Sequence, residues 1–114
     1  MTQARRALGV AGEDAVAAWY EDHGYAIVAR NWRCRDGELD LIVRTGRTFV
    51  FCEVKCRTSD AFGMPVEAVT RDKQARVRRL AARWLEDAPV PAREIRFDVA
   101  SVMDNVVEVL EGAF

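Results

Sequence analysis

The chain has 114 residues, of which half are hydrophobic and 31% are charged, and its formal net charge is −1. These values predict one folded domain over residues 1–114 and exclude a disordered chain. The near-neutral charge gives the molecule no overall field that would attract nucleic acid or an anionic membrane. No apolar run reaches the roughly 18 residues that span a bilayer, and Glu13 and Asp14 interrupt the N-terminal apolar stretch too early for a signal peptide. We therefore expect a cytoplasmic protein without membrane contact.

The first predicted element is a helix over residues 4–22, whose apolar stripe consists of Leu8, Gly12, Ala15 and Trp19. Gly24 follows this run and ends it. Residues 25–33, 39–43 and 48–56 are then rich in strand-forming side chains and predict three strands.

A loop is predicted over residues 57–65, and a second helix begins either at Pro65 or after an N-cap at Thr70. This helix is expected to end near Asp87, because prolines follow directly. Two more strands are predicted over residues 95–102 and 106–110, on either side of a turn. The order α-β-β-β-α-β-β predicts an α/β sandwich with a central, mixed five-stranded sheet flanked by helices.

The second and third strands are predicted to form a hairpin with a two-residue turn, Gly46-Arg47. Glycine in the first turn position indicates a type II′ turn, which fixes the register of the two strands. Asp40 would then face Glu53 on one side of the sheet, with Glu38 facing Lys55. The opposite side would carry the apolar pairs Leu39–Val54, Leu41–Cys52 and Val43–Val50.

Two carboxylates that face each other across neighbouring strands repel by about 1 kcal/mol or more. A shared proton would relieve this repulsion between Asp40 and Glu53, and so would a divalent cation such as Mg²⁺, which prefers oxygen ligands. A cross-strand salt bridge from Lys55 is a third solution. Spacing alone leaves all three open.

Lys73 falls on the apolar stripe of the second predicted helix, together with Val77, Leu80 and Trp84. A lysine on a buried stripe is rare unless it is paired. We therefore expect Lys73 to reach the acidic cluster or a phosphate. The alternative is a side chain that extends along the helix into solvent.

The basic residues are concentrated in residues 70–83, which carry a net charge of +5. Such a helix is either a phosphate-binding surface or a solvated face, and both interpretations stay open. Four further arginines are expected near the open end of the hairpin, where they would contact phosphates. With the first arginine of the basic segment, the candidate phosphate contacts are Arg30, Arg33, Arg35, Arg57 and Arg71.

Three cysteines, Cys34, Cys52 and Cys56, form no zinc-binding pattern and are expected to be free thiols. Asp98 is expected to pair with Arg96 along one strand, and a supporting role at the acidic site is the alternative.

Gly37-Glu38-Leu39-Asp40 precedes Glu53-Val54-Lys55 in the chain, and this arrangement resembles the signature of the PD-(D/E)xK nuclease superfamily. Further motifs extend the likeness over essentially the whole chain: Gly12-Glu13, Gly24-Tyr25, Arg30-Asn31-Trp32-Arg33, Phe62-Gly63, Lys73, Arg96-Phe97-Asp98 and Ala113-Phe114. Together they resemble the YraN-type family, a group of small bacterial proteins with a restriction-endonuclease-like fold that is related to archaeal Holliday-junction resolvases.

The resemblance implies that Asp40 and Glu53, with the Val54 carbonyl, bind Mg²⁺ or Mn²⁺. Lys55 would orient or deprotonate the attacking water, and Glu13 would match an additional acid of resolvase-like members. The implied activity is metal-dependent cleavage of structured DNA in recombination or repair. A nucleic-acid-binding module without catalysis and an interaction protein with a structural acid–lysine cluster remain alternatives. Resolvase relatives act as dimers, so a homodimer is also open.

Overall fold

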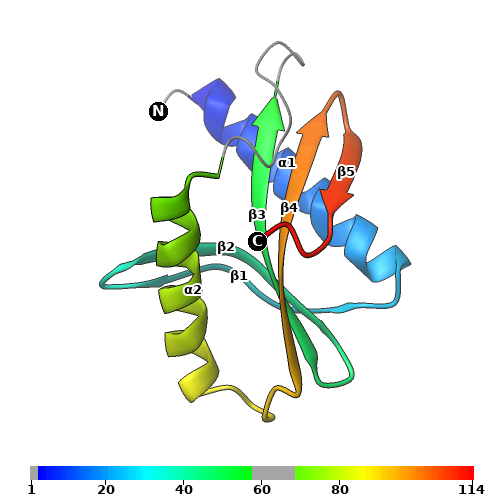
Figure 1. The fold of residues 1–114 in the computed structure, drawn as a ribbon. Helices are drawn as coiled ribbons and strands as arrows, with labels where there is room; N and C mark the ends of the chain where they lie inside the picture. The colour runs from blue at the N-terminus through cyan, green and yellow to red at the C-terminus, as the bar shows by residue number, and fades with distance from the viewer. Residues whose placement is uncertain (1–2, 58–68) are drawn as a thin grey trace.

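The computed structural model describes residues 3–57 and 69–114 (Figure 1). Its elements follow the predicted order: α1 (Gln3–Asp22), β1 (Ala26–Cys34), β2 (Gly37–Thr45), β3 (Thr48–Arg57), α2 (Arg71–Glu86), β4 (Glu94–Met103) and β5 (Val106–Leu110). The predicted loop over residues 57–65 lies outside the described residues apart from Arg57, which ends β3.

The five strands form one sheet in the order β1-β2-β3-β4-β5. The β3–β4 pair is parallel and the other neighbours are antiparallel, which makes the sheet mixed as predicted. Helix α1 packs on one face and α2 on the other (Figure 1). Neither described helix is apolar over a length that would cross a membrane.

The apolar stripe of α1 differs from the predicted one. Val16 and Tyr20 are fully buried, and Ala17 is 6% exposed, whereas the predicted Ala15 and Trp19 are only partly buried. The periodicity was correct but the centre of the stripe lies one residue further along the helix. The predicted stripe did not include Tyr20, whose hydroxyl donates a hydrogen bond to the buried Asp98 carboxylate.

Helix α2 begins after Thr70, the later of the two predicted starts. The Thr70 side chain accepts a hydrogen bond from the Lys73 amide at 3.2 Å, so it caps an otherwise unpaired donor. Val77, Leu80 and Ala81 face the sheet and are buried. This cap fixes where the helix starts, and thereby where Lys73 lies on it.

The β2–β3 hairpin has the predicted turn and register up to Leu41–Cys52. Gly46 has φ +60°, while Arg47 is not among the described residues with positive φ, as a type II′ turn requires. On the N-terminal side of Leu41, β2 is no longer paired with β3, so the predicted pairs Leu39–Val54 and Glu38–Lys55 are wrong. Strand β2 leaves β3 there while it stays paired with β1 (Figure 1).

Leu39 is also on the other side of the sheet from the one predicted. It packs in the α2-side core, whereas Leu41 and Val43 belong to the α1-side core. Strict alternation would put all three on one face, so the strand twists where it separates from β3. This separation opens the sheet at Asp40.

Candidate functional site

The acidic residues of the sequence motif lie where β2 and β3 separate. At this point the Val54 amide donates its hydrogen bond to a side chain of β2 and not to its backbone. The acceptor is Oδ2 of Asp40, at 2.9 Å. A buried amide needs a partner when the neighbouring strand leaves, and the Asp40 carboxylate provides it. The predicted proximity of Asp40 to Glu53 is therefore achieved by a side-chain contact at the end of the ladder rather than by a paired register.

Glu53 points to the α2 side of the sheet and is 5% exposed. Its Oε1 lies 4.0 Å from Nζ of Lys73, which comes from the first turns of α2. The expectation that Lys73 reaches the acidic cluster is confirmed. Its side chain keeps 26% exposure, so the ammonium bridges the acid and the solvent.

Burial, and after it the neighbouring Asp40 carboxylate, raises the pKa of Glu53 to about 7. Lys73 and Lys55 oppose the shift without cancelling it. The pKa of Asp40 is also raised, first by burial and then by Glu38, although the hydrogen bond from the Val54 amide counteracts this. Burial and the Asp40 charge thus disfavour the ionised form of Glu53, as expected of a shared proton or a cation site.

Lys55 completes the cluster from β3, two residues after Glu53. Burial lowers its pKa, and the neighbouring Lys73 amine lowers it further, while both acids raise it. A lysine whose pKa is lowered is present more often as the neutral amine, which is the form that can accept a proton. The cluster therefore holds two acids with raised pKa values and an amine with a lowered one.

The donor set fits Mg²⁺ or Mn²⁺. Asp40 and Glu53 present hard carboxylate oxygens, and Mg²⁺ sites in proteins typically use one or two carboxylates with water and phosphate for the rest. Within residues 3–57 and 69–114, no group of three or more acids, histidines or cysteines is arranged to hold a metal. Two carboxylates would leave the other coordination positions of such a cation to water and phosphate.

Glu13, the additional acid of the sequence prediction, lies on α1 and contacts β1. Its Oε2 accepts a hydrogen bond from the Asn31 side chain at 3.0 Å and lies 3.9 Å from Arg30. Arg30 in turn binds Asp14 at 2.6 Å. These contacts connect α1 to β1, and none of the contacts described for Glu13 joins it to Asp40 or Glu53.

The predicted phosphate-binding arginines fall into two groups. Arg33 is paired with Glu38 across the β1–β2 ladder at 2.5 Å, and Arg30 is paired with acids of α1. Arg35 and Arg71 are exposed. The side chain of Arg57 lies outside the described residues. Arg30 and Arg33 are therefore ion-paired, and all four arginines whose side chains are described lie on the surface.

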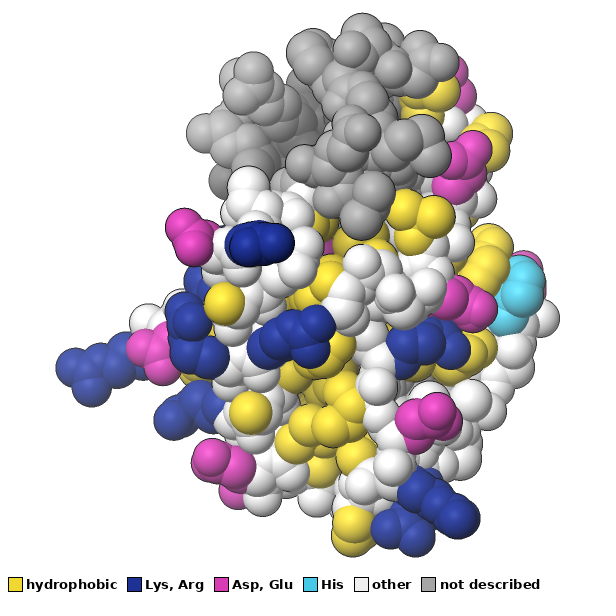
Figure 2. Space-filling view, in the orientation of Figure 1, with side chains coloured by type: hydrophobic (Ala, Val, Ile, Leu, Met, Phe, Trp, Pro, Cys, Tyr) yellow, Lys and Arg dark blue, Asp and Glu magenta, His cyan; other side chains and the backbone are white. Residues whose placement is uncertain are grey.

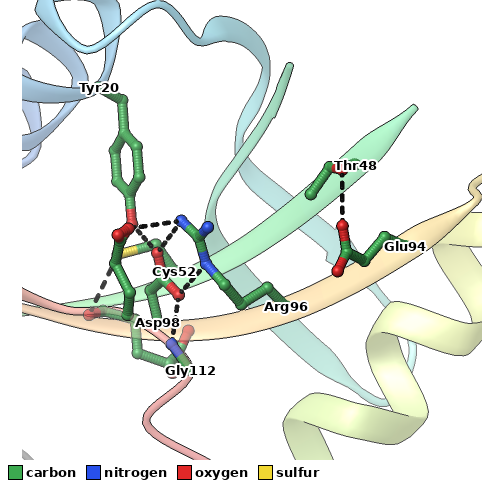
Figure 3. A network of polar contacts seen from close by, with 9 residues as sticks. Tyr20, Thr48, Cys52, Glu94, Arg96, Asp98 and Gly112 are labelled. Atoms are coloured by element: carbon green, nitrogen blue, oxygen red, sulfur yellow. Dashed lines mark hydrogen bonds and ion pairs between the residues drawn. The ribbon is translucent and has the colours of Figure 1, made fainter. Parts of the chain in front are cut away.

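A second polar cluster surrounds Asp98 on β4 (Figure 3). Asp98 is 0% exposed and accepts two hydrogen bonds from Arg96, both at 2.9 Å, which confirms the predicted strand pair. The Tyr20 hydroxyl donates a third at 2.6 Å and the Gly112 amide a fourth at 3.0 Å. Tyr20 was not among the residues predicted for this cluster, although a phenol within an apolar helix stripe indicates a buried hydrogen-bond partner.

All three cysteines are free, as predicted. Cys52 is buried, and burial strongly raises the pKa of its thiol. A Cβ at Gly12 would lie 2.2 Å from Sγ of Cys56, so glycine is needed for α1 to approach β3 this closely. The thiols therefore act as packing groups.

The element order, the mixed sheet and the acids at the point where its central strands separate define an α/β protein of the restriction-endonuclease-like fold. The chain belongs to the family described as "Uncharacterised protein family UPF0102", whose model matches residues 12–102. This is the YraN family that the sequence motifs predicted.

Several relatives support this membership. The chain is 56% identical over 101 residues to a UPF0102 protein of Beutenbergia cavernae, covering 89% of this chain and 86% of that protein. It is 54% identical to one of Nocardia farcinica, covering 87% and 78% of the two chains. A UPF0102 protein of Frankia alni is 49% identical, with 98% of both chains covered. These similarities identify the family and extend over 78–98% of the length of these relatives.

Proposed function

We propose that this protein is a cytoplasmic endonuclease that hydrolyses phosphodiester bonds in structured DNA with Mg²⁺ or Mn²⁺, in recombination or repair. The observation that carries the proposal is the buried Glu53, whose pKa is raised to about 7 against Asp40 with two lysines beside it. A purely structural ion cluster would be expected to favour the charged form of its acid. Here the charged form is disfavoured, which suits a site that is completed by a cation.

In this proposal Asp40 and Glu53 hold the cation, together with the Val54 carbonyl. The bound cation would polarise a phosphate oxygen and lower the pKa of water. Lys55, whose pKa is lowered, orients the attacking water and accepts its proton. Lys73 directs its ammonium towards Glu53 and the phosphate, where it stabilises negative charge in the transition state. Arg35 and Arg71 are exposed and contact phosphates further along the DNA.

The proposal is tested by cleavage of junction, flap, single-stranded and duplex DNA in the presence of Mg²⁺ or Mn²⁺. Wild type should cut at least one branched substrate. Lys55→Met keeps the aliphatic stem and removes the amine, so it should lower kcat by about 100-fold or more while metal binding persists. Glu108→Gln, on β5, is a matched control and should cleave like wild type.

Metal binding is measured separately, as a rise in melting temperature with Mg²⁺ or Mn²⁺. The double variant Asp40→Asn, Glu53→Gln should lose this rise, and Lys55→Met should retain it. Cleavage at the wild-type rate by folded Lys55→Met, or an unchanged metal response in the double variant, would overturn the proposal. Salt-sensitive DNA binding without cleavage under any condition would instead indicate a non-catalytic binding module.

A further inference from the structure

A groove separate from the acidic cluster runs between α2 and β4. Its volume is about 480 Å³, within the range of small-molecule sites. Its main lining residues are Arg78, Leu85, Ile95, Arg96, Phe97 and Phe114. Ile95 is 45% exposed, which is high for a large apolar side chain. Figure 2 shows apolar surface in the middle of this face, with basic side chains on both sides.

The groove contains the outer end of an aromatic stack. Phe51 is buried, and its ring stacks on Phe97 with centroids 5.7 Å apart and an interplanar angle of 29°. Phe97 stacks in turn on Phe114, at 5.2 Å and 20°. Three nearly parallel rings thus run from the core to a partly exposed ring at the chain end. Such a stack can be extended by a further flat aromatic ring.

The charge beside this stack favours an anionic partner. The Arg78 guanidinium lies 4.9 Å from the centroid of Phe97 and 5.5 Å from that of Phe114. Helix α2 carries six basic residues, Arg71, Lys73, Arg76, Arg78, Arg79 and Arg83, against the two acids Asp72 and Glu86. Arg96 on the far wall is neutralised by Asp98 and by Glu111 at 3.4 Å. Of the basic residues of α2, Arg78 lines the groove, so it is the cation that an anionic partner would meet there.

The groove is close to the acidic cluster. Phe97, which lines the groove, is paired with Phe51 on β3, and Phe51 precedes Glu53 by two residues, or about 7 Å along the strand. Arg78 follows Lys73 by five residues on α2, a rise of about 8 Å. A polymer whose backbone reaches Glu53 and Lys73 can therefore place a side group in the groove within one or two units.

We propose that this groove binds an unpaired nucleobase of the DNA substrate, which stacks on Phe114 while its phosphate faces Arg78. The inference rests on the proposed function and narrows the substrate class to DNA with an unpaired base close to the cleaved bond. A base inside an intact duplex is stacked on both sides and does not reach such a pocket without being extruded. Base–aromatic stacking accepts any base, so no sequence preference follows.

The test is DNA binding without metal, in EDTA, followed by fluorescence anisotropy. The two probes are duplexes with one unpaired thymine or with an abasic unit at the same position. Wild type should bind the thymine probe about tenfold more tightly, as one stacked base contributes. Phe114→Ala should reduce this preference to less than about threefold. Arg78→Ala should weaken the binding of both probes, because both retain the phosphate. Its matched control, Arg79→Ala, removes the same charge one residue away and should weaken neither probe to the same extent.

The side chains changed in these variants are the partly buried last residue of the chain and two exposed arginines, so each variant is expected to fold, which melting curves verify. Equal affinity of wild type for both probes would overturn the groove proposal, and so would a full preference in Phe114→Ala. If the groove binds an apolar peptide instead of a nucleobase, wild type should likewise bind both probes with equal affinity. Loss of cleavage or of the metal response with the base preference intact would overturn the catalytic proposal alone. Absence of binding to every DNA would overturn both.

Discussion

Two buried acids on adjacent strands have opposite surroundings. Asp98 on β4 is 0% exposed and accepts four hydrogen bonds from Arg96, Tyr20 and the Gly112 amide (Figure 3). Glu53 on β3 is 5% exposed, but its nearest ammonium is 4.0 Å away and a second carboxylate lies beside it. Similar burial is therefore combined with full pairing in one case and with repulsion in the other.

This difference shows that burial alone does not distinguish a structural acid from a functional one. Burying a charge costs several kcal/mol unless hydrogen bonds and an opposite charge replace its water. The Asp98 cluster has these partners, whereas the Asp40–Glu53 pair lacks enough of them. The first should stabilise the fold, and the second should reduce stability in exchange for a place where a ligand binds.

The largest expected effect on the stability of the protein comes from a substitution of Asp98. Asp98→Asn keeps the shape of the side chain but leaves Arg96 facing an amide in place of its carboxylate. We expect the free energy of unfolding to fall by about 3 kcal/mol or more, as when one partner of a buried pair is removed. Urea unfolding measures this. A loss below about 1 kcal/mol would mean that the cluster contributes little.

The second prediction concerns Glu53 and has the opposite sign. Its folded-state pKa of about 7 lies above the ordinary value of 4.5, so the folded protein binds the extra proton between these pH values. The stability from this group is complete below pH 4.5 and is lost as the pH rises through 7. Glu53→Gln should therefore equal wild type near pH 4.5 and exceed it by up to about 3 kcal/mol at pH 8 without metal.

Urea unfolding of wild type and Glu53→Gln at pH 5 and pH 8 checks this prediction. The difference between the two proteins isolates Glu53 from other titrating groups. Glu111→Gln, an exposed acid, is the control and should show no comparable pH-dependent gain. If Glu53→Gln is less stable than wild type at pH 8, Glu53 belongs to the same class as Asp98 and the contrast between the sites is lost.

The smallest expected effect measures how much the Tyr20 hydroxyl contributes to the Asp98 cluster. Tyr20→Phe removes the hydroxyl that donates to Asp98 but keeps the buried ring. Because Arg96 and the Gly112 amide still bind Asp98, the stability should fall by only about 1–2 kcal/mol. Equal losses in Tyr20→Phe and Asp98→Asn would show that the phenol, rather than Arg96, is the main partner.

Sequence patterns predicted the element order, the type II′ turn at Gly46 and the N-cap at Thr70, because each depends on a few neighbouring residues. Lys73 was predicted to reach the acids from its position on a helix stripe, and it does. These features are local, or follow from one periodicity. Short-range sequence signals were therefore sufficient to predict these features.

The end of the β2–β3 ladder was not predictable in the same way. Leu39 alternates with Leu41 and Val43 in the sequence, yet it packs on the other face because the sheet twists where β2 follows β1 away from β3. That twist depends on the whole sheet and on α2. The pairing of Tyr20 with Asp98 joins residues 78 positions apart, which no local pattern encodes.

The parallel pairing of β3 with β4 has a consequence for synthesis of the chain. Ten residue pairs, from Thr48–Glu94 to Arg57–Met103, join segments that are separated by α2. While the ribosome is still making α2, the apolar strand β3 has an open edge of unpaired backbone groups. The central sheet can therefore assemble only after β4 has emerged from the ribosome. Until then the nascent chain is most prone to aggregation or to binding by chaperones.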